Sequence, residues 1–229
     1  MKTVGIIGGH GPETTADFYM RVVRLSEKLE NQRPPILLWN DPIPLELESA
    51  LLNSGTRVEE YIPYLTAAAQ KLSQGGAELL VMPCNTLHIL EPQIRASVST
   101  PFLSIIDATA NAMESRGVDC VGLLATPLTI QTRLYQDAFE SRGIESMVPS
   151  SDDGEVLGKI IADVCLGNHD DASEESFMRI MDTLAQRGVK DLLFACTDLQ
   201  ILKARHAECN VHDTTDILAQ ATMEVMRKD

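Results

Sequence analysis

Two cysteines stand out in the sequence because each directly follows a short apolar segment. Cys84 lies in ELLVMPCNTLHIL and Cys196 in DLLFACTDLQIL, so both segments run from apolar residues through a cysteine to a more polar stretch. The thiolate is the reactive form of cysteine, and backbone N–H groups and the helix dipole stabilise it at the start of a helix. A cysteine between a buried strand and a helix start is therefore a candidate acid or base.

Two such thiols are suited to act together on one carbon atom. If they face each other across a cleft, one thiolate removes a proton from one face of the carbon and the opposite thiol returns a proton to the other face, which inverts the stereocentre. A Cys–His nucleophile is the weaker alternative. His88 lies four residues after Cys84, but acyl transfer would leave Cys196 without a role. We therefore interpret His88 as a structural residue.

The remaining cysteines do not form a recognisable framework. The chain has five cysteines, an odd number with irregular spacing and no C-x-x-C pair. This pattern argues against a disulfide network and against a zinc site, so we expect no metal and a reducing, cytoplasmic compartment. We interpret Cys120 and Cys209 as small hydrophobic residues of the core.

Segments typical of strands and helices alternate along the chain, which predicts an α/β fold with parallel sheets. Short apolar runs predict strands at 3–9, 34–40, 77–84, 101–106, 120–126, 145–150, 190–196 and 210–213. Amphipathic stretches predict helices at 12–30, 58–76, 129–143, 154–166, 174–187 and 214–227. Open α/β sheets bind ligands outside the carboxyl ends of their strands, where Cys84 and Cys196 fall.

An internal repeat accounts for the two similar cysteine segments. A shift of 112 residues aligns 72–90 with 184–202 without a gap, and eight of the 19 positions are identical, including Cys84 and Cys196. The starts of the two halves also match, with VGII at 4–7 and VGLL at 121–124. General similarity between βα units does not explain a rare residue in register. We therefore predict two pseudo-symmetric, Rossmann-like halves.

The composition narrows the class of partner. The chain has 229 residues, 44% of them hydrophobic, and a formal net charge of -14. Nucleic acids and anionic membranes attract clustered lysine and arginine, so we expect neither as a partner. No apolar run approaches the roughly 18 residues that a membrane-spanning helix needs. A small-molecule substrate is the expected ligand.

Four motifs, GIIGGHGPE, MPCNTLH, GLLATPLTI and ACTDL, occur in this order over nearly the full length of the chain. With them the chain resembles the aspartate/glutamate racemase superfamily of cofactor-independent racemases, and within it the aspartate racemase branch. The resemblance implies two Rossmann-like domains, 1–98 plus 208–229 and 99–207, with the active site in the cleft between them. It also implies a homodimer that uses neither pyridoxal phosphate nor a metal.

The resemblance also implies roles for individual residues around the two matched motifs. Cys84 and Cys196 would be the catalytic acid/base pair. Asn85, Thr86 and Thr197 would bind the substrate carboxylate with side-chain and backbone donors, in the manner of an oxyanion site.

Four further positions depart from the family pattern. Asp198 stands where glutamate is usual and is expected to orient Cys196 or the substrate ammonium group. His10 stands where methionine is common, beside a glycine-rich turn, and is expected to touch the ligand. Glu46 and Cys165 stand where aspartate racemases carry arginine and lysine, although another racemase branch has the same Glu and CLG. The cations suited to a second carboxylate are thus missing. We expect Glu46 to contact the substrate ammonium or a polar or basic side chain.

Three functions fit these observations. The first is an amino-acid racemase that works through two cysteines, and it is the function we predict. The second is other chemistry of the superfamily, such as a hydantoin racemase, a maleate isomerase or a decarboxylase, of which the last needs only one cysteine. The third is a non-catalytic Rossmann-like binding protein, but GIIGGHGP lacks the full G-x-G-x-x-G spacing and the later acidic residue of a dinucleotide site.

Overall fold

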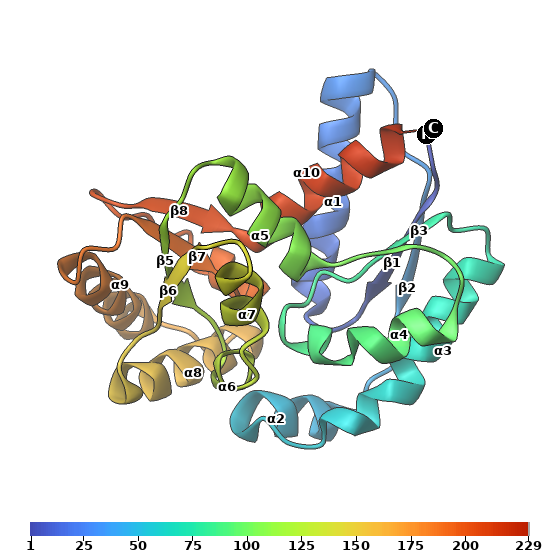
Figure 1. Ribbon diagram of the computed structural model, residues 1–229. Coiled ribbons are helices and arrows are strands. Elements are labelled where there is room, and N and C mark those ends of the chain that lie inside the picture. Colours follow the sequence, from blue (N-terminus) through green and yellow to red (C-terminus); the bar gives the residue numbers. More distant parts are fainter. Residues whose placement is uncertain (229) are drawn as a thin grey trace.

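The computed structural model describes residues 1–228 and contains two parallel sheets of four strands, one in each lobe of the molecule (Figure 1). The first sheet has the order β2-β1-β3-β4 and the second has the equivalent order β6-β5-β7-β8. The predicted α/β fold with two similar halves is confirmed. The strands are β1 (Val4–Gly8), β2 (Ile36–Asn40), β3 (Leu79–Val81), β4 (Phe102–Leu103), β5 (Cys120–Leu124), β6 (Glu145–Met147), β7 (Asp191–Phe194) and β8 (Asn210–Asp213).

Helices cover both sheets and fill the space between them. Short 3₁₀ helices, η2 and η3, directly follow the two cysteines, as the sequence repeat requires. The helices are α1 (Pro12–Glu30), α2 (Leu45–Ser54), η1 (Val58–Tyr61), α3 (Ile62–Gln74), η2 (Thr86–Leu90), α4 (Glu91–Ser97), α5 (Ile105–Ser115), α6 (Pro127–Gln131), α7 (Leu134–Glu140), α8 (Ser151–Cys165), α9 (Asp171–Gln186), η3 (Thr197–Leu202) and α10 (Thr214–Arg227).

The two halves related by the sequence repeat also share the same side-chain packing around one glycine. Gly5 in β1 and Gly122 in β5 occupy equivalent central positions, where a helix of the same half lies close to the sheet. A Cβ atom on Gly5 would lie 2.8 Å from Leu80 Cδ2, and one on Gly122 would lie 2.8 Å from Leu192 Cδ2. Leu80 and Leu192 are themselves 112 residues apart in the sequence. The same glycine is therefore needed twice, for the same steric reason.

One hydrophobic core runs between the two sheets rather than within one half. It joins Val4 of β1 and Phe18 of α1 to Val121 of β5 and Met223 of α10, all of them buried. The helices α5 and α10 lie between the two lobes, and α10 also crosses α1 (Figure 1). Two further cores fill the outer sides of the two sheets. The halves are thus held together by shared apolar side chains, whose burial drives folding.

Strand pairing crosses the predicted domain boundaries at two places. The range 99–207 was predicted as the second domain, but β4 (Phe102–Leu103) pairs with β3 of the first sheet. The range 208–229 was predicted to join the first domain, but β8 (Asn210–Asp213) pairs with β7 of the second sheet. Each half completes its sheet with the strand that follows its cysteine segment. The helices after β4 and β8, together with α1 and α7, contribute to the core between the halves.

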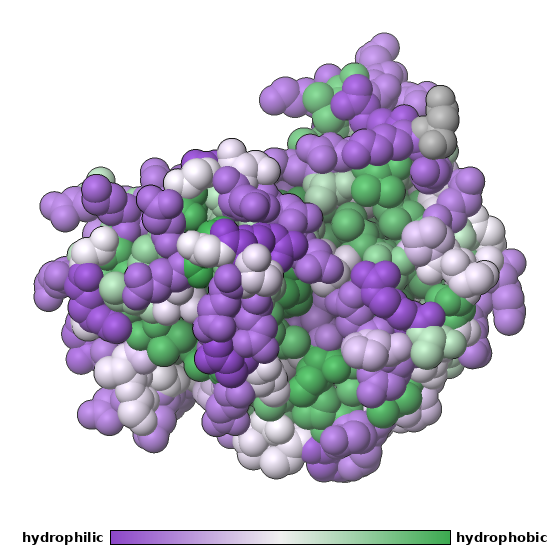
Figure 2. Space-filling model, in the orientation of Figure 1, coloured by the Kyte–Doolittle hydropathy of each residue, from purple (hydrophilic) through white to green (hydrophobic). Residues whose placement is uncertain are grey.

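The surface is largely hydrophilic, with several hydrophobic areas, one of them beside α10 (Figure 2). A groove lies between α5 and α10 in this region, and Leu103, Ile217, Ala221 and Val225 contribute its apolar lining. The predicted homodimer remains a prediction.

Candidate active site

The carboxyl ends of the two sheets meet at one cavity. Its walls come from the loops after β1, β3, β5 and β7, together with α2, η1 and the last residue of α8. With its open mouth included, the cavity encloses about 640 Å³, which is in the range of small-molecule sites. The lining residues are Gly9, His10, Gly11, Ile43, Glu48, Leu51, Leu52, Tyr61, Cys84, Asn85, Thr86, Leu87, Thr126, Cys165, Cys196, Thr197 and Asp198.

Cys84 and Cys196 line this cavity from opposite halves of the molecule. Cys84 follows β3, and a tight turn there brings its backbone N–H to the Met82 carbonyl at 2.9 Å. Cys196 follows β7 and is buried, with 7% of its surface exposed. Both cysteines are free thiols. The structure therefore places the two predicted thiols in one cavity, at equivalent ends of equivalent strands.

Burial sets the protonation state of both thiols. It raises the pKa of Cys84 to about 12, and the backbone N–H groups of η2 oppose this shift while the Asp198 charge adds to it. Burial likewise raises the pKa of Cys196 well above its ordinary range, and the Asp198 carboxylate raises it further. Backbone N–H groups of η3 act in the opposite direction. The stabilising groups expected from the sequence are present, but desolvation outweighs them.

Asp198 connects the second half of the site to the first. Its Oδ2 lies 3.9 Å from the Cys196 Sγ, while its Oδ1 accepts a hydrogen bond of 2.6 Å from the Thr14 hydroxyl in the first turn of α1. Gly11 has a φ of 90°, and a Cβ there would approach Asp198 Oδ1 to 3.3 Å. Asp198 therefore has the position expected from the sequence, beside Cys196, and α1 holds it there.

Thr86 makes the reciprocal connection from the first half to the second. Its Oγ1 lies 3.0 Å from the Thr126 hydroxyl and 3.1 Å from the Thr129 hydroxyl, both at the start of α6. Thr126 also caps α6, because its hydroxyl accepts a hydrogen bond from the Thr129 N–H at 3.2 Å. Sequence reasoning missed Thr126 as a cavity residue, although its motif, GLLATPLTI, matches the glycine-rich turn of the first half.

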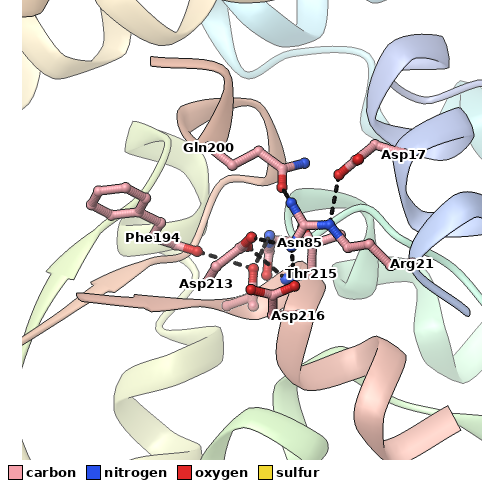
Figure 3. Close-up of polar contacts among 9 residues, drawn as sticks. Asp17, Arg21, Asn85, Phe194, Gln200, Asp213, Thr215 and Asp216 are labelled. Carbon is pink, nitrogen blue, oxygen red and sulfur yellow. Dashed lines mark hydrogen bonds and ion pairs between the residues drawn. The ribbon is translucent and has the colours of Figure 1, made fainter. Parts of the chain in front are cut away.

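The side chain of Asn85 is fixed by the second half of the molecule (Figure 3). Its Nδ2 donates to the Thr214 hydroxyl at 3.1 Å, and its Oδ1 accepts from the Tyr135 hydroxyl. The Thr214 hydroxyl in turn donates to the Phe194 carbonyl at the end of β7. One amide hydrogen of Asn85 is left for another acceptor. Thr197, the counterpart of Asn85 in the repeat, is buried in the cavity wall.

A charged cluster centred on Arg21 fixes η3 behind the cavity (Figure 3). The Arg21 guanidinium donates to Asp17 at 2.6 Å on its own helix and to Asp213 at 2.6 Å at the start of α10. It also contacts Asp216 and the side-chain carbonyl of Gln200 in η3. The guanidinium is a planar fork with five donors, so one residue can join three elements. The cluster holds the segment after Cys196 against α1 and α10.

His10 lies in the cavity wall with its ring almost fully covered. Its Nε2 pairs with Asp41 Oδ2 at 3.1 Å, and Asp41 also accepts a hydrogen bond of 3.0 Å from the Trp39 indole. The Tyr61 ring packs against the imidazole with 5.7 Å between the ring centroids. Within residues 1–228, the buried Nδ1 atom of His10 has no hydrogen-bond partner. The predicted ligand-contacting position of His10 thus coincides with a cavity-lining position.

Glu46 does not line the cavity, so the expectation that it contacts the substrate is wrong. Glu48 lines the cavity instead. Both residues lie in the first turn of α2, but Glu46 is exposed whereas Glu48 is half-buried in the cavity wall with Leu51 and Leu52. Positions three and four apart share a helix face, whereas positions two apart do not. Burial raises the pKa of Glu48 and the Asp198 charge adds to this shift, whereas a protonated His10 would oppose it.

Cys165 contributes a third thiol to the cavity from the end of α8. Burial raises its pKa, and the charge of Asp198 raises it further. Sequence reasoning identified the position as a departure from the aspartate racemase pattern but gave it no role. The structure places Cys165 near Asp198 and Cys196.

His88 has a structural position, as the sequence suggested. Its Nδ1 lies 2.7 Å from the Cys84 carbonyl, and its Nε2 accepts a hydrogen bond of 3.1 Å from the Ile105 N–H at the start of α5. Burial lowers the pKa of His88 to about 4, so the ring is neutral. His88 therefore fixes the loop that carries Cys84.

No group of three or more His, Cys, Asp and Glu side chains in residues 1–228 is arranged to hold a metal ion. Within the same residues, no helix combines the length and the apolar character required to cross a membrane.

Comparison with known proteins places this chain in one family. The model of the family described as Asp/Glu/Hydantoin racemase matches residues 7–222. A broad specificity amino-acid racemase, RacX of Bacillus subtilis, is 24% identical over 226 residues and covers 96% of each chain. The chain belongs to the Asp/Glu/hydantoin racemase family.

Solved structures support the same assignment over the whole chain. An aspartate racemase homologue from Pyrococcus horikoshii matches with a TM-score of 0.80 at 28% identity and covers all of both chains. The aspartate racemase of Picrophilus torridus matches with a TM-score of 0.81 at 26% identity, covering 100% of this chain and 96% of its own. The protein is therefore an isomerase of the racemase class.

Proposed function

We propose that the protein is a cofactor-independent amino-acid racemase in which Cys84 and Cys196 act as the two bases. The observation that supports this proposal is that both thiols line a single cavity from opposite halves of a pseudo-symmetric fold. A planar carbanion between two such thiols can be protonated from either face. One cysteine would give an exchange reaction at one face only, whereas two give inversion.

In the proposed reaction, Cα loses one proton and gains another. In one direction, the thiolate of one cysteine takes the α-proton and becomes a thiol, and the electron pair of the broken C–H bond stays on Cα. The thiol of the other cysteine then donates its proton to the opposite face and becomes a thiolate. Burial raises the pKa of both thiols, so the positive charge that a substrate ammonium brings would favour formation of the first thiolate.

The other predicted residues are proposed to orient the amino acid. The hydroxyl of Thr86, the remaining amide hydrogen of Asn85 and the segment at Thr197 would bind the α-carboxylate, and Asp198 would bind the α-ammonium beside Cys196. Each of them lines the cavity. Within the described residues, no lysine or arginine lines it, so a second carboxylate on the substrate would meet no cation. Aspartate is therefore not the proposed best substrate.

The alternatives are less well supported by the same cavity. A decarboxylase of this superfamily would use one thiol and leave the other idle. A hydantoin racemase or a maleate isomerase would also use both, and the substrate separates these chemistries from the proposed one. No observation favours a non-catalytic binding protein. A homodimer, a cytoplasmic location, and the lack of nucleic-acid and membrane partners remain parts of the proposal that rest on the sequence.

The test is racemisation by the purified protein. Each common amino acid, started separately from its L and D forms, is incubated in D2O, and chiral chromatography and loss of the α-proton NMR signal are followed. We expect racemisation that survives a metal chelator and hydroxylamine but not iodoacetamide.

Alanine variants test the two bases. We expect Cys84→Ala and Cys196→Ala each to lower the racemisation rate by about 10³-fold, within the range for loss of an acid/base group. The control is Cys120→Ala, because Cys120 begins β5 and is not among the cavity residues. Near wild-type racemisation by either active-site variant would contradict the proposal, as would chelator inactivation that added metal reverses.

A further inference from the structure

Negative charge predominates among the side chains that line the cavity. Glu48 and Asp198 both line it, and each raises the energy of placing further negative charge there. The negative charge of Asp198 raises the pKa of Glu48, which shows that the two carboxylates sense each other. Lysine and arginine are absent from the cavity lining within the described residues. Two partly buried carboxylates without a cation favour a ligand that supplies positive charge.

The unpartnered ring nitrogen of His10 points to the same kind of ligand. Asp41 accepts from Nε2, so in the neutral imidazole Nδ1 carries a lone pair and is an acceptor. This atom is buried and has no partner within residues 1–228, although His10 lines the cavity. A buried acceptor without a donor is costly, and a ligand N–H would satisfy it. His10 and Glu48 line the same cavity.

An apolar wall lies beside this polar end. Leu51 and Leu52 follow Glu48 by three and four residues, on the same face of α2, and Ile43 and Tyr61 complete the wall. Such a surface accommodates a chain of methylene groups while the carboxylate meets a terminal charge. Asp198, in contrast, comes from the opposite half, beside Cys196. The two carboxylates therefore come from opposite halves of the molecule, and both line the cavity.

We propose that the substrate is a diamino acid of the lysine or ornithine type, whose side-chain ammonium is bound by Glu48 and His10 while Asp198 binds the α-ammonium. This inference rests on the proposed racemase function and adds the class of side chain. A simple neutral amino acid has one ammonium for two carboxylates and leaves Glu48 unpaired. A diamino acid pairs both carboxylates and places its methylene groups on the apolar wall.

The test compares lysine with norleucine, which has the same carbon chain but no side-chain ammonium. We expect the ratio of kcat/KM for lysine to kcat/KM for norleucine to fall about 10- to 100-fold in Glu48→Gln, the range for losing a charge-assisted hydrogen bond. The matched control is Glu46→Gln, two residues away in the same turn but exposed, and it should leave the ratio unchanged. Glu48→Lys should lower the ratio further and raise kcat/KM for aspartate.

The outcomes separate the two proposals. Racemisation of norleucine or aspartate in preference to lysine and ornithine by the wild-type protein would overturn the diamino acid inference but leave the two-thiol racemase intact. An unchanged ratio in Glu48→Gln, with circular dichroism showing a folded variant, would also overturn it. If Glu48→Gln does not fold, the ratio in Glu48→Asp decides, because its shorter carboxylate should still lower the ratio. Absence of racemisation with every amino acid would overturn both proposals.

Discussion

The two halves of the site share one scaffold but differ in charge. In both, a cysteine ends the third strand of its sheet, and the residue two positions later reaches across to the first helix turn of the other half. From Thr86 this contact is a set of three neutral hydroxyls with Thr126 and Thr129. From Asp198 it is a carboxylate bound to Thr14. The fold is thus nearly symmetric, whereas the electrostatic environment of the two thiols is not.

This difference implies that the two cysteines carry out the same kind of proton transfer in different electrostatic environments. Asp198 lies 3.9 Å from the Cys196 Sγ, so it penalises the Cys196 thiolate more directly than the Cys84 thiolate. Like charges at this separation interact by several kcal/mol even in a partly screened site, on the order of 4 kcal/mol. A racemase needs two opposed bases but does not need them to be alike, because substrate binding changes both pKa values.

The largest expected effect tests whether the thiols work on opposite faces. Cys84→Ala and Cys196→Ala should each retain α-proton exchange in D2O for one enantiomer, because each keeps one base, while racemisation falls about 10³-fold. The retained enantiomer should differ between the two variants. Single-enantiomer exchange is measured by NMR, with chiral chromatography to show that the configuration is kept. Exchange of the same enantiomer by both variants would mean that the thiols do not oppose each other.

A smaller effect is expected on the reactivity of Cys196 when its charged neighbour is removed. The Asp198 carboxylate raises the pKa of Cys196, so Asp198→Asn should lower that pKa and increase the thiolate fraction at a given pH. We expect alkylation of Cys196 by iodoacetamide to become faster at pH 8, because the thiolate is the form that reacts. Peptide mass spectrometry separates its rate from that of Cys84.

The wild-type protein supplies the reference for this prediction. Because burial raises the pKa of Cys84 to about 12, its alkylation rate should keep rising about tenfold per pH unit beyond pH 9, where an ordinary thiol levels off. The matched variant Thr86→Val removes the equivalent contact without removing a charge, and it should leave the Cys196 rate unchanged. Equal acceleration in both variants would show that cavity opening, not charge, is responsible.

The smallest expected effect concerns the scaffold and should be the same in both halves. Gly5→Ala and Gly122→Ala each place a Cβ 2.8 Å from a leucine side chain, so each should lower the free energy of unfolding by about 1–3 kcal/mol. Urea unfolding followed by circular dichroism measures it. Gly154→Ala in α8 meets no atom within 4 Å and should instead stabilise by about 0.5–1 kcal/mol. A large effect at only one of the two strand positions would break the equivalence.

Local patterns predicted the elements that carry the cysteines. The amphipathic stretch with Pro12 near its start predicted the helix at 12–30, which is α1 with the same bounds. The 112-residue repeat predicted that Cys84 and Cys196 would occupy equivalent places, and the strand order explains why they meet. Such features follow from periodicity and from residues that recur in register.

The parts that failed depend on contacts between distant segments. Glu46 was chosen because it stands where aspartate racemases carry arginine, but the segment after Pro44 forms α2, and helical geometry brings Glu48 to the cavity instead. The apolar pair Leu51 and Leu52, three and four residues after Glu48, was the signal that identifies this face. The helices α4 and α5 were also not predicted. Their apolar positions pack against partners from other elements that sequence spacing does not reveal.

The strand pairing of β4 and β8 shows a second limit. By residue type, IIDAT at 105–109 aligns loosely with VHDTT at 211–215. The sheet register gives a different match. Leu103 pairs with Val81 and His212 pairs with Leu193, so Leu103 and His212 are equivalent. The residues that follow them, Ser104 and Asp213, are therefore the equivalent helix caps. Ser and Asp both cap helices by accepting a backbone N–H, and a comparison of residue types alone cannot align them.

The core that passes between the sheets also has a consequence for how the chain folds. Phe18 near the start and Met223 near the end share one cluster, so this core closes only after almost the whole chain has been arranged. Long-range contacts of this kind slow folding, because the entropy of loop closure is lost before apolar burial compensates for it. When one half unfolds, the apolar inner face of the other half is exposed to water. Both thiols should therefore become accessible in a single cooperative transition, and a partly folded chain would have neither base in place.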